Sequence, residues 1–101
     1  MRNIAFTLFF FLLSFHAFAA EQLVVIYTTS WCGHCKSVKT YLNNLQIPFT
    51  NYDIETSDIG KQKFTALKGK GVPLIFVGSD RIDGFDKVAL EKALINQGLL
   101  K

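Results

Sequence analysis

The pattern of residues 23–45 restricts the fold of this chain more than any other stretch. Residues 23–27 form a continuous apolar and β-branched run, which is typical of a strand buried on both faces. Turn and cap residues follow at 28–30, and apolar residues then recur at helical spacing, at Val38, Tyr41, Leu42 and Leu45. A buried strand followed at once by an amphipathic helix predicts helices packed on a sheet.

The turn between this strand and this helix contains the only two cysteines of the chain, Cys32 and Cys35. A structural disulfide at this spacing closes a very small loop, so it would stabilise the fold little. At the start of a helix, free N–H groups and the positive end of the helix dipole stabilise a thiolate. We therefore predict a redox-active pair in which Cys32 attacks a substrate disulfide and Cys35 resolves the mixed disulfide. The alternative is a pair of inert, buried cysteines.

Three neighbours of the cysteines have predicted roles. Gly33 allows the turn to form, and His34 adds a titratable group beside Cys32. A positive charge or an N–H donor on His34 favours the thiolate, which makes the disulfide a stronger oxidant. Trp31 offers a flat apolar surface for substrate, although partly buried packing explains it equally well. For His34 the alternative is an exposed residue that has no effect on the dithiol.

The first nineteen residues read as an export signal rather than as part of the domain. Arg2 supplies a basic start, an apolar run follows over residues 4–15, and Ala17-Phe18-Ala19 has small residues at the cleavage positions. We predict cleavage near Ala19 and one domain over residues 20–101. Such a short signal favours a bacterial periplasm. The alternative is an uncleaved membrane anchor over residues 4–20, which would hold the domain in the same compartment.

The charge of the domain does not favour nucleic acid as a partner. Loss of Arg2 with the leader reduces the Lys and Arg count from 11 to 10 against 8 acidic residues. The resulting net charge of roughly +2 is small, and the lysines are scattered rather than clustered. The sequence therefore predicts no nucleic-acid binding, and membrane contact only if the leader is retained.

The rest of the chain continues the alternation of strands and helices. Residues 49–54 predict a strand, and residues 55–57 cap a helix with apolar positions at Ile59, Phe64 and Leu67. After a loop at 68–71, residues 72–77 and 81–83 predict a hairpin with its turn at 78–80.

A last helix completes the predicted domain. Asp86 is its expected N-cap, Gly98 follows its end, and the inward positions are Val88, Ala89, Ala93 and Leu94. The predicted order is β-α-β-α-β-β-α, which gives an α/β fold with a four-stranded mixed sheet and helices on both faces.

Three segments of this chain resemble the glutaredoxin family within the thioredoxin fold. They are residues 27–35 (Y-T-T-S-W-C-G-H-C), residues 71–78 (G-V-P-L-I-F-V-G) and residues 82–86 (I-D-G-F-D). The resemblance implies a thiol–disulfide oxidoreductase acting on disulfide- or thiol-bearing proteins. The Gly-His pair between the cysteines also resembles the active site of protein disulfide isomerase, which implies a dithiol of oxidising character.

The same resemblance implies a substrate site around Val72 and Pro73. This pair resembles the cis-proline element that the fold places opposite the dithiol, where the Val72 backbone would pair with an extended substrate; an ordinary trans proline is the alternative.

For glutathione, Gly84 and Asp86 match the family's binding turn, and Lys70 can replace a basic contact. Thr29 stands where the family has a basic residue. The implied co-substrate is therefore weakly bound glutathione, with no tightly bound cofactor.

Two other function classes remain open from the sequence. Two thiolates in a C-x-x-C loop can hold a soft ion, so an exported Cu(I) carrier is one alternative. A closed zinc site is not expected, because the mature chain adds only His34 to the two cysteines and we predict no metal ligands. The other alternative is a thioredoxin-like binding module in which the dithiol has no catalytic role.

Overall fold

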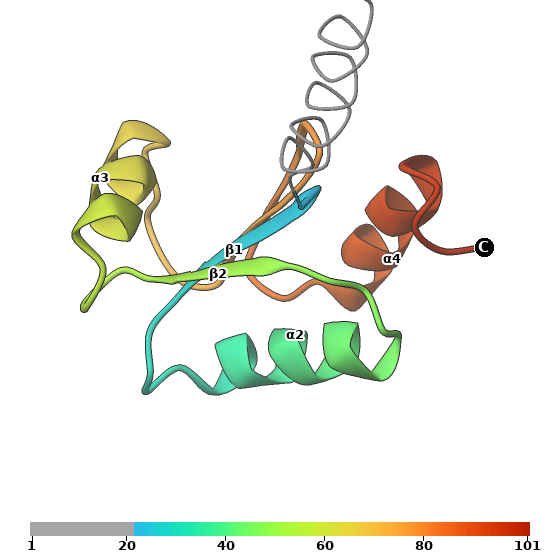
Figure 1. Ribbon diagram of the computed structural model, residues 1–101, viewed down its shortest axis with the longest axis horizontal. Coiled ribbons are helices and arrows are strands. Elements are labelled where there is room, and N and C mark those ends of the chain that lie inside the picture. The colour runs from blue at the N-terminus through green and yellow to red at the C-terminus, as the bar shows by residue number, and fades with distance from the viewer. Residues whose placement is uncertain (1–21) are drawn as a thin grey trace, which may run out of the picture.

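The computed structural model describes residues 22–101 (Figure 1). The predicted leader at residues 1–19 and its cleavage site lie outside the described residues. Within residues 22–101, no helix has the length and apolar character needed to cross a bilayer. The elements follow the predicted order: β1 (Val24–Thr28), α2 (Gly33–Asn44), β2 (Thr50–Asp53), α3 (Asp58–Ala66), β3 (Leu74–Val77), β4 (Asp80–Asp83) and α4 (Lys87–Asn96).

The strands form one four-stranded mixed sheet in the order β2-β1-β3-β4. β1 and β2 are parallel, with Thr28 opposite Asp53 at their carboxyl ends. β3 runs antiparallel to both β1 and β4, and β3 and β4 form the predicted hairpin. Helices lie on both sides of the sheet (Figure 1). The predicted thioredoxin-type α/β fold is therefore confirmed.

One side of the sheet, which we call the aliphatic face, carries the main core. Alternate strand residues point into it, and α2 and α4 cover it (Figure 1). Burial of each large aliphatic side chain stabilises the fold by about 1.5–3 kcal/mol. The buried residues are Val24, Ile26, Ile75, Val77 and Ile82 from the strands, Val38 and Leu42 from α2, and Leu90, Ala93 and Leu94 from α4.

The other side, which we call the aromatic face, is covered by α3. The Tyr27 ring stacks on Tyr52 with centroids 5.4 Å apart, and it also contacts Phe64 of α3 and Phe76 of β3. Tyr27 is buried, whereas the other three rings are half-buried. Two cations lie over the rim of this cluster, Lys63 over the Tyr52 ring and Arg81 over the Phe76 ring.

Side-chain caps begin α3 and α4, as their sequences predict. Ser57 Oγ accepts the N–H of Gly60 at 2.9 Å, and Asp86 Oδ1 accepts the N–H of Ala89 at 3.1 Å. Each bond satisfies one of the helix N–H groups that have no partner within the helix. Both boundaries are therefore set by local chemistry.

The three helices within residues 22–101 end in the same backbone motif. One residue after the cap adopts the left-handed conformation, and the next residue donates its N–H to a carbonyl five residues earlier. The left-handed residues are Gln46 (φ 58°), Lys68 (φ 58°) and Gly98 (φ 76°). Only the last follows the expected glycine pattern. α2 ends at Asn44, and Leu45, the last apolar position of the predicted helical pattern, is its C-cap with 37% exposure.

The inward face of α4 differs from the prediction at two positions. Val88 is 75% exposed, and Leu90 is fully buried instead. Leu90 shares a helix face with Ala93 and Leu94, whereas Val88 lies two residues earlier and thus nearly opposite on a helix with 3.6 residues per turn. The prediction of an inward Val88 was wrong because it combined residues from two faces.

Candidate active site

Cys32 and Cys35 form a disulfide at the amino end of α2. Their Cα atoms are 5.2 Å apart. Cys32 is half-buried and Cys35 is fully buried. A substrate approaching from solvent therefore meets the sulfur of Cys32 first.

Cys32 is itself the N-cap residue of α2. Its backbone is extended (φ −88°, ψ 112°), and its Sγ accepts the N–H of Cys35 at 3.0 Å. The predicted cap at residues 28–30 is thus replaced by the cysteine sulfur. Because helix N–H groups and the helix dipole favour negative charge, this position stabilises a thiolate on Cys32 when the bond is reduced.

Gly33 and His34 are exposed on the first turn of α2. Gly33 has no left-handed backbone, and a Cβ at this position would meet no atom within 4 Å. Neither backbone conformation nor packing therefore requires glycine at this position. His34 takes part in no ion pair among residues 22–101, so it stands beside the dithiol as a solvent-facing group.

A cleft of about 560 Å³ opens beside the dithiol on the side of the aromatic face. It brings together three predicted substrate residues, Trp31, Lys70 and Val72. Thr29 also lines it. Thr29 is buried, and its hydroxyl has no hydrogen-bond partner among the described residues. The cleft thus combines an aromatic wall, a cation and a buried hydroxyl.

Glu55 is a residue of this cleft that the sequence reasoning missed. Trp31 is 70% exposed, and its indole Nε1–H donates to Glu55 Oε2 at 3.0 Å. Asp53 Oδ1 accepts the backbone N–H of Glu55 at 2.9 Å and so fixes the turn that carries it. The parallel pairing of β1 and β2 could have indicated Glu55, because the loops after Thr28 and Asp53 leave the same edge of the sheet.

The bond between Val72 and Pro73 is cis. Pro73 is buried, and its carbonyl accepts the N–H of Gly84 at 2.8 Å, which brings the Gly84 turn beside it. Val72 lies outside the strands, and neither its N–H nor its carbonyl is hydrogen-bonded within residues 22–101. A smaller hollow of about 350 Å³ joins Lys70, Val72 and Gly84. The backbone of Val72 is therefore available to an extended partner.

Asp86 lies outside both hollows. Its carboxylate is engaged in capping α4 through the N–H of Ala89. Its predicted contact with substrate stays a prediction. In the described part of the chain, no three His, Cys, Asp or Glu side chains lie together in a way that could hold a metal ion.

Residues 24–82 match the family model described as glutaredoxin. The chain belongs to the glutaredoxin family. It is 30% identical over 73 residues to the glutaredoxin-like 8.6 kDa protein of the Clostridium pasteurianum rubredoxin operon, covering 71% of this chain and 97% of that one. As a glutaredoxin-family protein with a C-x-x-C pair at disulfide distance, it is a thiol–disulfide oxidoreductase in the general sense.

Solved structures of glutaredoxins have the same fold. Wheat glutaredoxin is 30% identical and superposes with a TM-score of 0.62, covering 80% of each chain. The buckwheat glutaredoxin–glutathione complex superposes with a TM-score of 0.60 over 78% of this chain and 82% of that one. At 20% identity, the second likeness is one of fold.

Proposed function

We propose that this protein exchanges disulfides with other proteins by cycling Cys32 and Cys35 between dithiol and disulfide. Glutathione mixed disulfides are the alternative substrate. The observation that carries the proposal is the position of Cys32 as N-cap of α2, with its Sγ 3.0 Å from the N–H of the buried Cys35. This arrangement pairs an accessible, stabilised thiolate with a shielded resolving thiol.

The reaction proceeds in two balanced steps. The Cys32 thiolate attacks one sulfur of the substrate disulfide, forms a mixed disulfide and releases the other substrate sulfur as a thiolate, which takes up a proton. Cys35 then loses its proton and attacks Cys32 Sγ, which frees the second substrate thiol. The substrate gains two electrons, and the enzyme ends as the Cys32–Cys35 disulfide. The reverse sequence oxidises a substrate dithiol.

In this proposal His34 tunes the redox potential of the dithiol, and the cleft binds the substrate. His34, exposed on the first turn of α2, favours the Cys32 thiolate through positive charge or an N–H donor, which makes the disulfide a stronger oxidant. Trp31 offers its exposed ring to the substrate, and the free backbone of Val72 pairs with an extended segment. Pro73 holds that segment of the chain opposite the dithiol.

Glutathione binds weakly in this proposal. Lys70 and the Gly84 turn are available for its carboxylates, and Asp86 retains a predicted contact. Buckwheat glutaredoxin, which shares the fold, was solved as a glutathione complex. In this chain the neutral Thr29 stands where the family has a basic residue, and Glu55 adds a carboxylate to the cleft. Both differences weaken the attraction for a tripeptide that carries two carboxylates.

We further propose that the domain works in an oxidising compartment outside the cytoplasm. The support is the leader pattern at residues 1–19, with Ala17 and Ala19 at the cleavage positions. A bacterial periplasm fits the short leader. The mass of the protein isolated from its native compartment tests this, because cleavage after Ala19 removes the leader and an intact mass points to an anchor.

The decisive test combines a redox titration with two turnover assays. The purified domain is equilibrated in glutathione buffers, and its activity is measured on a protein disulfide and on a glutathionylated peptide. We expect a two-electron titration and turnover on the protein disulfide. Absence of activity on both, with Cu(I) retained after desalting, would overturn the enzyme proposal in favour of a metal carrier. If the protein shows neither turnover nor Cu(I) retention, the binding-module alternative remains.

The variant Cys35→Ser separates the two substrate classes. We expect it to lose turnover on protein disulfides, because the mixed disulfide is no longer resolved. Activity that survives on the glutathionylated peptide means that Cys32 alone suffices for that substrate.

The variant His34→Gln tests the tuning role. It removes the titratable group at an exposed position without changing the backbone, and we expect a more reducing dithiol. An unchanged potential in the same glutathione titration refutes the role of His34, and Ser37→Ala, one turn further along α2, serves as the control.

A further inference from the structure

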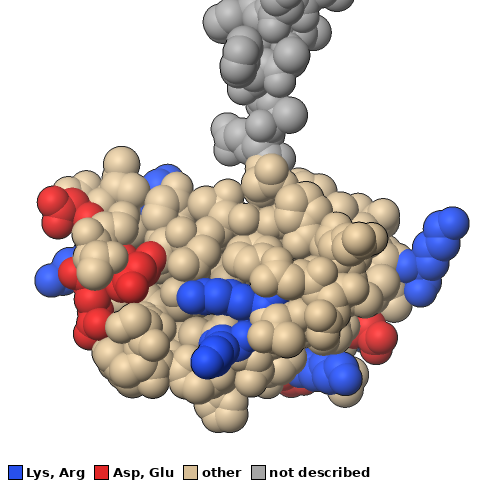
Figure 2. Space-filling view, turned by 60° about the horizontal axis from the view of Figure 1, so that its bottom comes forward, with Lys and Arg blue, Asp and Glu red and all other residues tan. Residues whose placement is uncertain are grey.

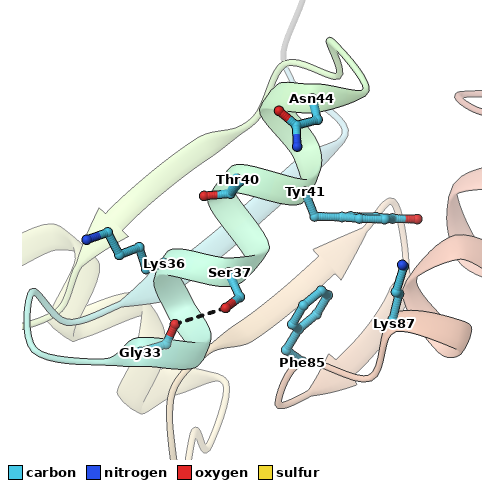
Figure 3. Close-up of a pocket in the computed structure, with 8 residues that line it drawn as sticks. All are labelled: Gly33, Lys36, Ser37, Thr40, Tyr41, Asn44, Phe85 and Lys87. Carbon is cyan, nitrogen blue, oxygen red and sulfur yellow. Dashed lines mark hydrogen bonds between the residues drawn. The ribbon is translucent and has the colours of Figure 1, made fainter.

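A groove of about 460 Å³ runs along α2 (Figure 3) and shares no lining residue with the Trp31 cleft. It starts at Gly33, next to Cys32, and passes Ser37 and Tyr41. The segment that leads into α4 forms its opposite wall, with Phe85 and Lys87. The groove shares only the residue next to the nucleophile with the site described above.

The floor of this groove is aromatic. The rings of Tyr41 and Phe85 lie 5.9 Å apart, and both residues are half-buried against the core of the aliphatic face. Polar side chains of α2, among them Thr40 and Asn44, line the side of the groove (Figure 3). An apolar floor with hydroxyl and amide groups along one side suits an extended peptide, which needs both surfaces.

The charge of this groove has one sign. Its lining includes Lys36 and Lys87 and no acidic residue. The whole of α2 carries Lys36 and Lys39 without an Asp or Glu. Figure 2 turns the α2 side toward the viewer and shows Lys and Arg side chains near the middle of this face, with acidic side chains toward its edges. The charged residues that line the groove are therefore all positive.

Lys87 keeps its charge available to a ligand. Glu91 is four residues further along α4, at the spacing that favours an ion pair. Nevertheless the Lys87 Nζ lies over the Tyr41 ring, 5.7 Å from its centroid, and residues 22–101 contain no ion pair other than that between Arg81 and Asp83. Glu91 is close enough to contribute to the raised pKa of Tyr41, after burial, but it does not line the groove.

We propose that this groove binds an acidic, extended segment of the protein substrate, adjacent to the substrate cysteine that exchanges with Cys32. The proposal rests on the proposed function, because the substrate must first reach Cys32. A chain joined to Cys32 has the groove within reach at Gly33, and the Val72 backbone holds the segment on the other side. Charge complementarity then selects substrates with Asp or Glu on the groove side of their cysteine.

Two matched peptides test this selection. Both carry the same central disulfide-bonded cysteine, and one has three Glu and the other three Lys on the same side of it. At low salt the wild-type protein should reduce the acidic peptide with the higher kcat/KM. This preference should decline as the salt concentration rises, since the charges are exposed.

A variant that reverses one charge of the groove tests its role in this selection. Lys87→Glu should lower the preference for the acidic peptide about three- to tenfold. Lys92→Glu, on the same helix, makes the same charge change at an exposed position outside the groove and should leave the preference unaltered. Hydroxyethyl disulfide, a small neutral substrate, should react equally with all three proteins.

The outcomes separate the two proposals. Absence of turnover by the wild type on every disulfide overturns the proposed function. Normal turnover with equal rates on both peptides, or an equal effect of Lys87→Glu and Lys92→Glu, overturns the groove alone. Loss of activity of Lys87→Glu on hydroxyethyl disulfide also counts against it, because a docking residue should not change the chemistry. The variant Lys87→Gln, which only neutralises the charge, should fall between the wild type and Lys87→Glu.

Discussion

The two faces of the sheet differ in how completely they are covered. The aliphatic face lies under α2 and α4, and its strand residues are buried. The aromatic face lies under the nine-residue α3, and Tyr52, Phe64 and Phe76 keep part of their surface in solvent. The first face holds α2 and its disulfide in place, and the second forms a wall of the Trp31 cleft through Phe64. The fully buried aliphatic packing thus lies on one face, and the Trp31 cleft opens on the other.

The largest effect should follow a cavity on the aliphatic face. Leu42 of α2 is fully buried, so Leu42→Ala removes packing that the surrounding strands cannot replace. We expect a loss of about 2–5 kcal/mol in the free energy of unfolding. Urea denaturation monitored by circular dichroism measures it. A loss below about 1 kcal/mol would show that this face is less tightly packed than its burial indicates.

A smaller effect should follow truncation on the aromatic face. Phe64→Ala should cost about 1–3 kcal/mol, because the ring already keeps part of its surface in water. It should also raise the KM for a protein disulfide, since the ring lines the cleft. Phe64→Leu is the control that keeps apolar volume. If Phe64→Ala lowers the free energy of unfolding as much as Leu42→Ala and leaves KM unchanged, the two faces do not differ in the way described.

Glycine substitutions at the left-handed residues that follow α2 and α3 should change the free energy of unfolding equally on the two faces. Gln46 ends the dithiol helix and Lys68 ends α3, both with φ of 58°, a conformation that favours glycine. Gln46→Gly and Lys68→Gly should each raise the free energy of unfolding by about 0.5–1 kcal/mol. Asn44→Gly, at the last helical residue of α2, should lower it by about 1 kcal/mol. Unequal gains would mean that tertiary packing, and not local backbone conformation, decides these positions.

The smallest effect concerns alkaline pH. Burial, and then the neighbouring Tyr52, raise the pKa of Tyr27 on the aromatic face above its ordinary value of 10.0. The folded state therefore holds this proton more tightly than the unfolded chain, and its contribution to stability is lost as pH rises through the folded pKa. Tyr27→Phe should unfold with a weaker pH dependence above pH 10.0 than the wild type. An identical dependence would exclude Tyr27 as the titrating group.

Local patterns predicted most of the fold. The β-branched run of β1, the caps Ser57 and Asp86 and the Gly98 terminus depend on neighbours in the sequence, and the structure agrees with each. Val88 was misplaced because two faces of α4 carry apolar residues, and periodicity alone does not say which one meets the sheet. The end of α2 has no glycine signal in the sequence, because Gln46 takes the left-handed position.

The candidate site was predicted only where its residues belong to a local sequence motif. The two cysteines and Pro73 follow from motifs, but Glu55 reaches Trp31 across 24 positions, through the pairing of β1 with β2. The groove along α2 likewise depends on Phe85 and Lys87, which the hairpin and the start of α4 bring beside Tyr41. Contacts of this kind are set by the register of the sheet and have no local sequence signal.

The open surroundings of Gly33 leave one position of the active site free to vary. Gly33 is the first residue of α2, and a Cβ there would meet nothing within 4 Å. The first helical position also accepts proline readily, because its N–H has no partner within the helix. The residue after Cys32 can therefore be exchanged without repacking the domain. A side chain at this position would change the surface beside Cys32 and leave the packing of the domain intact.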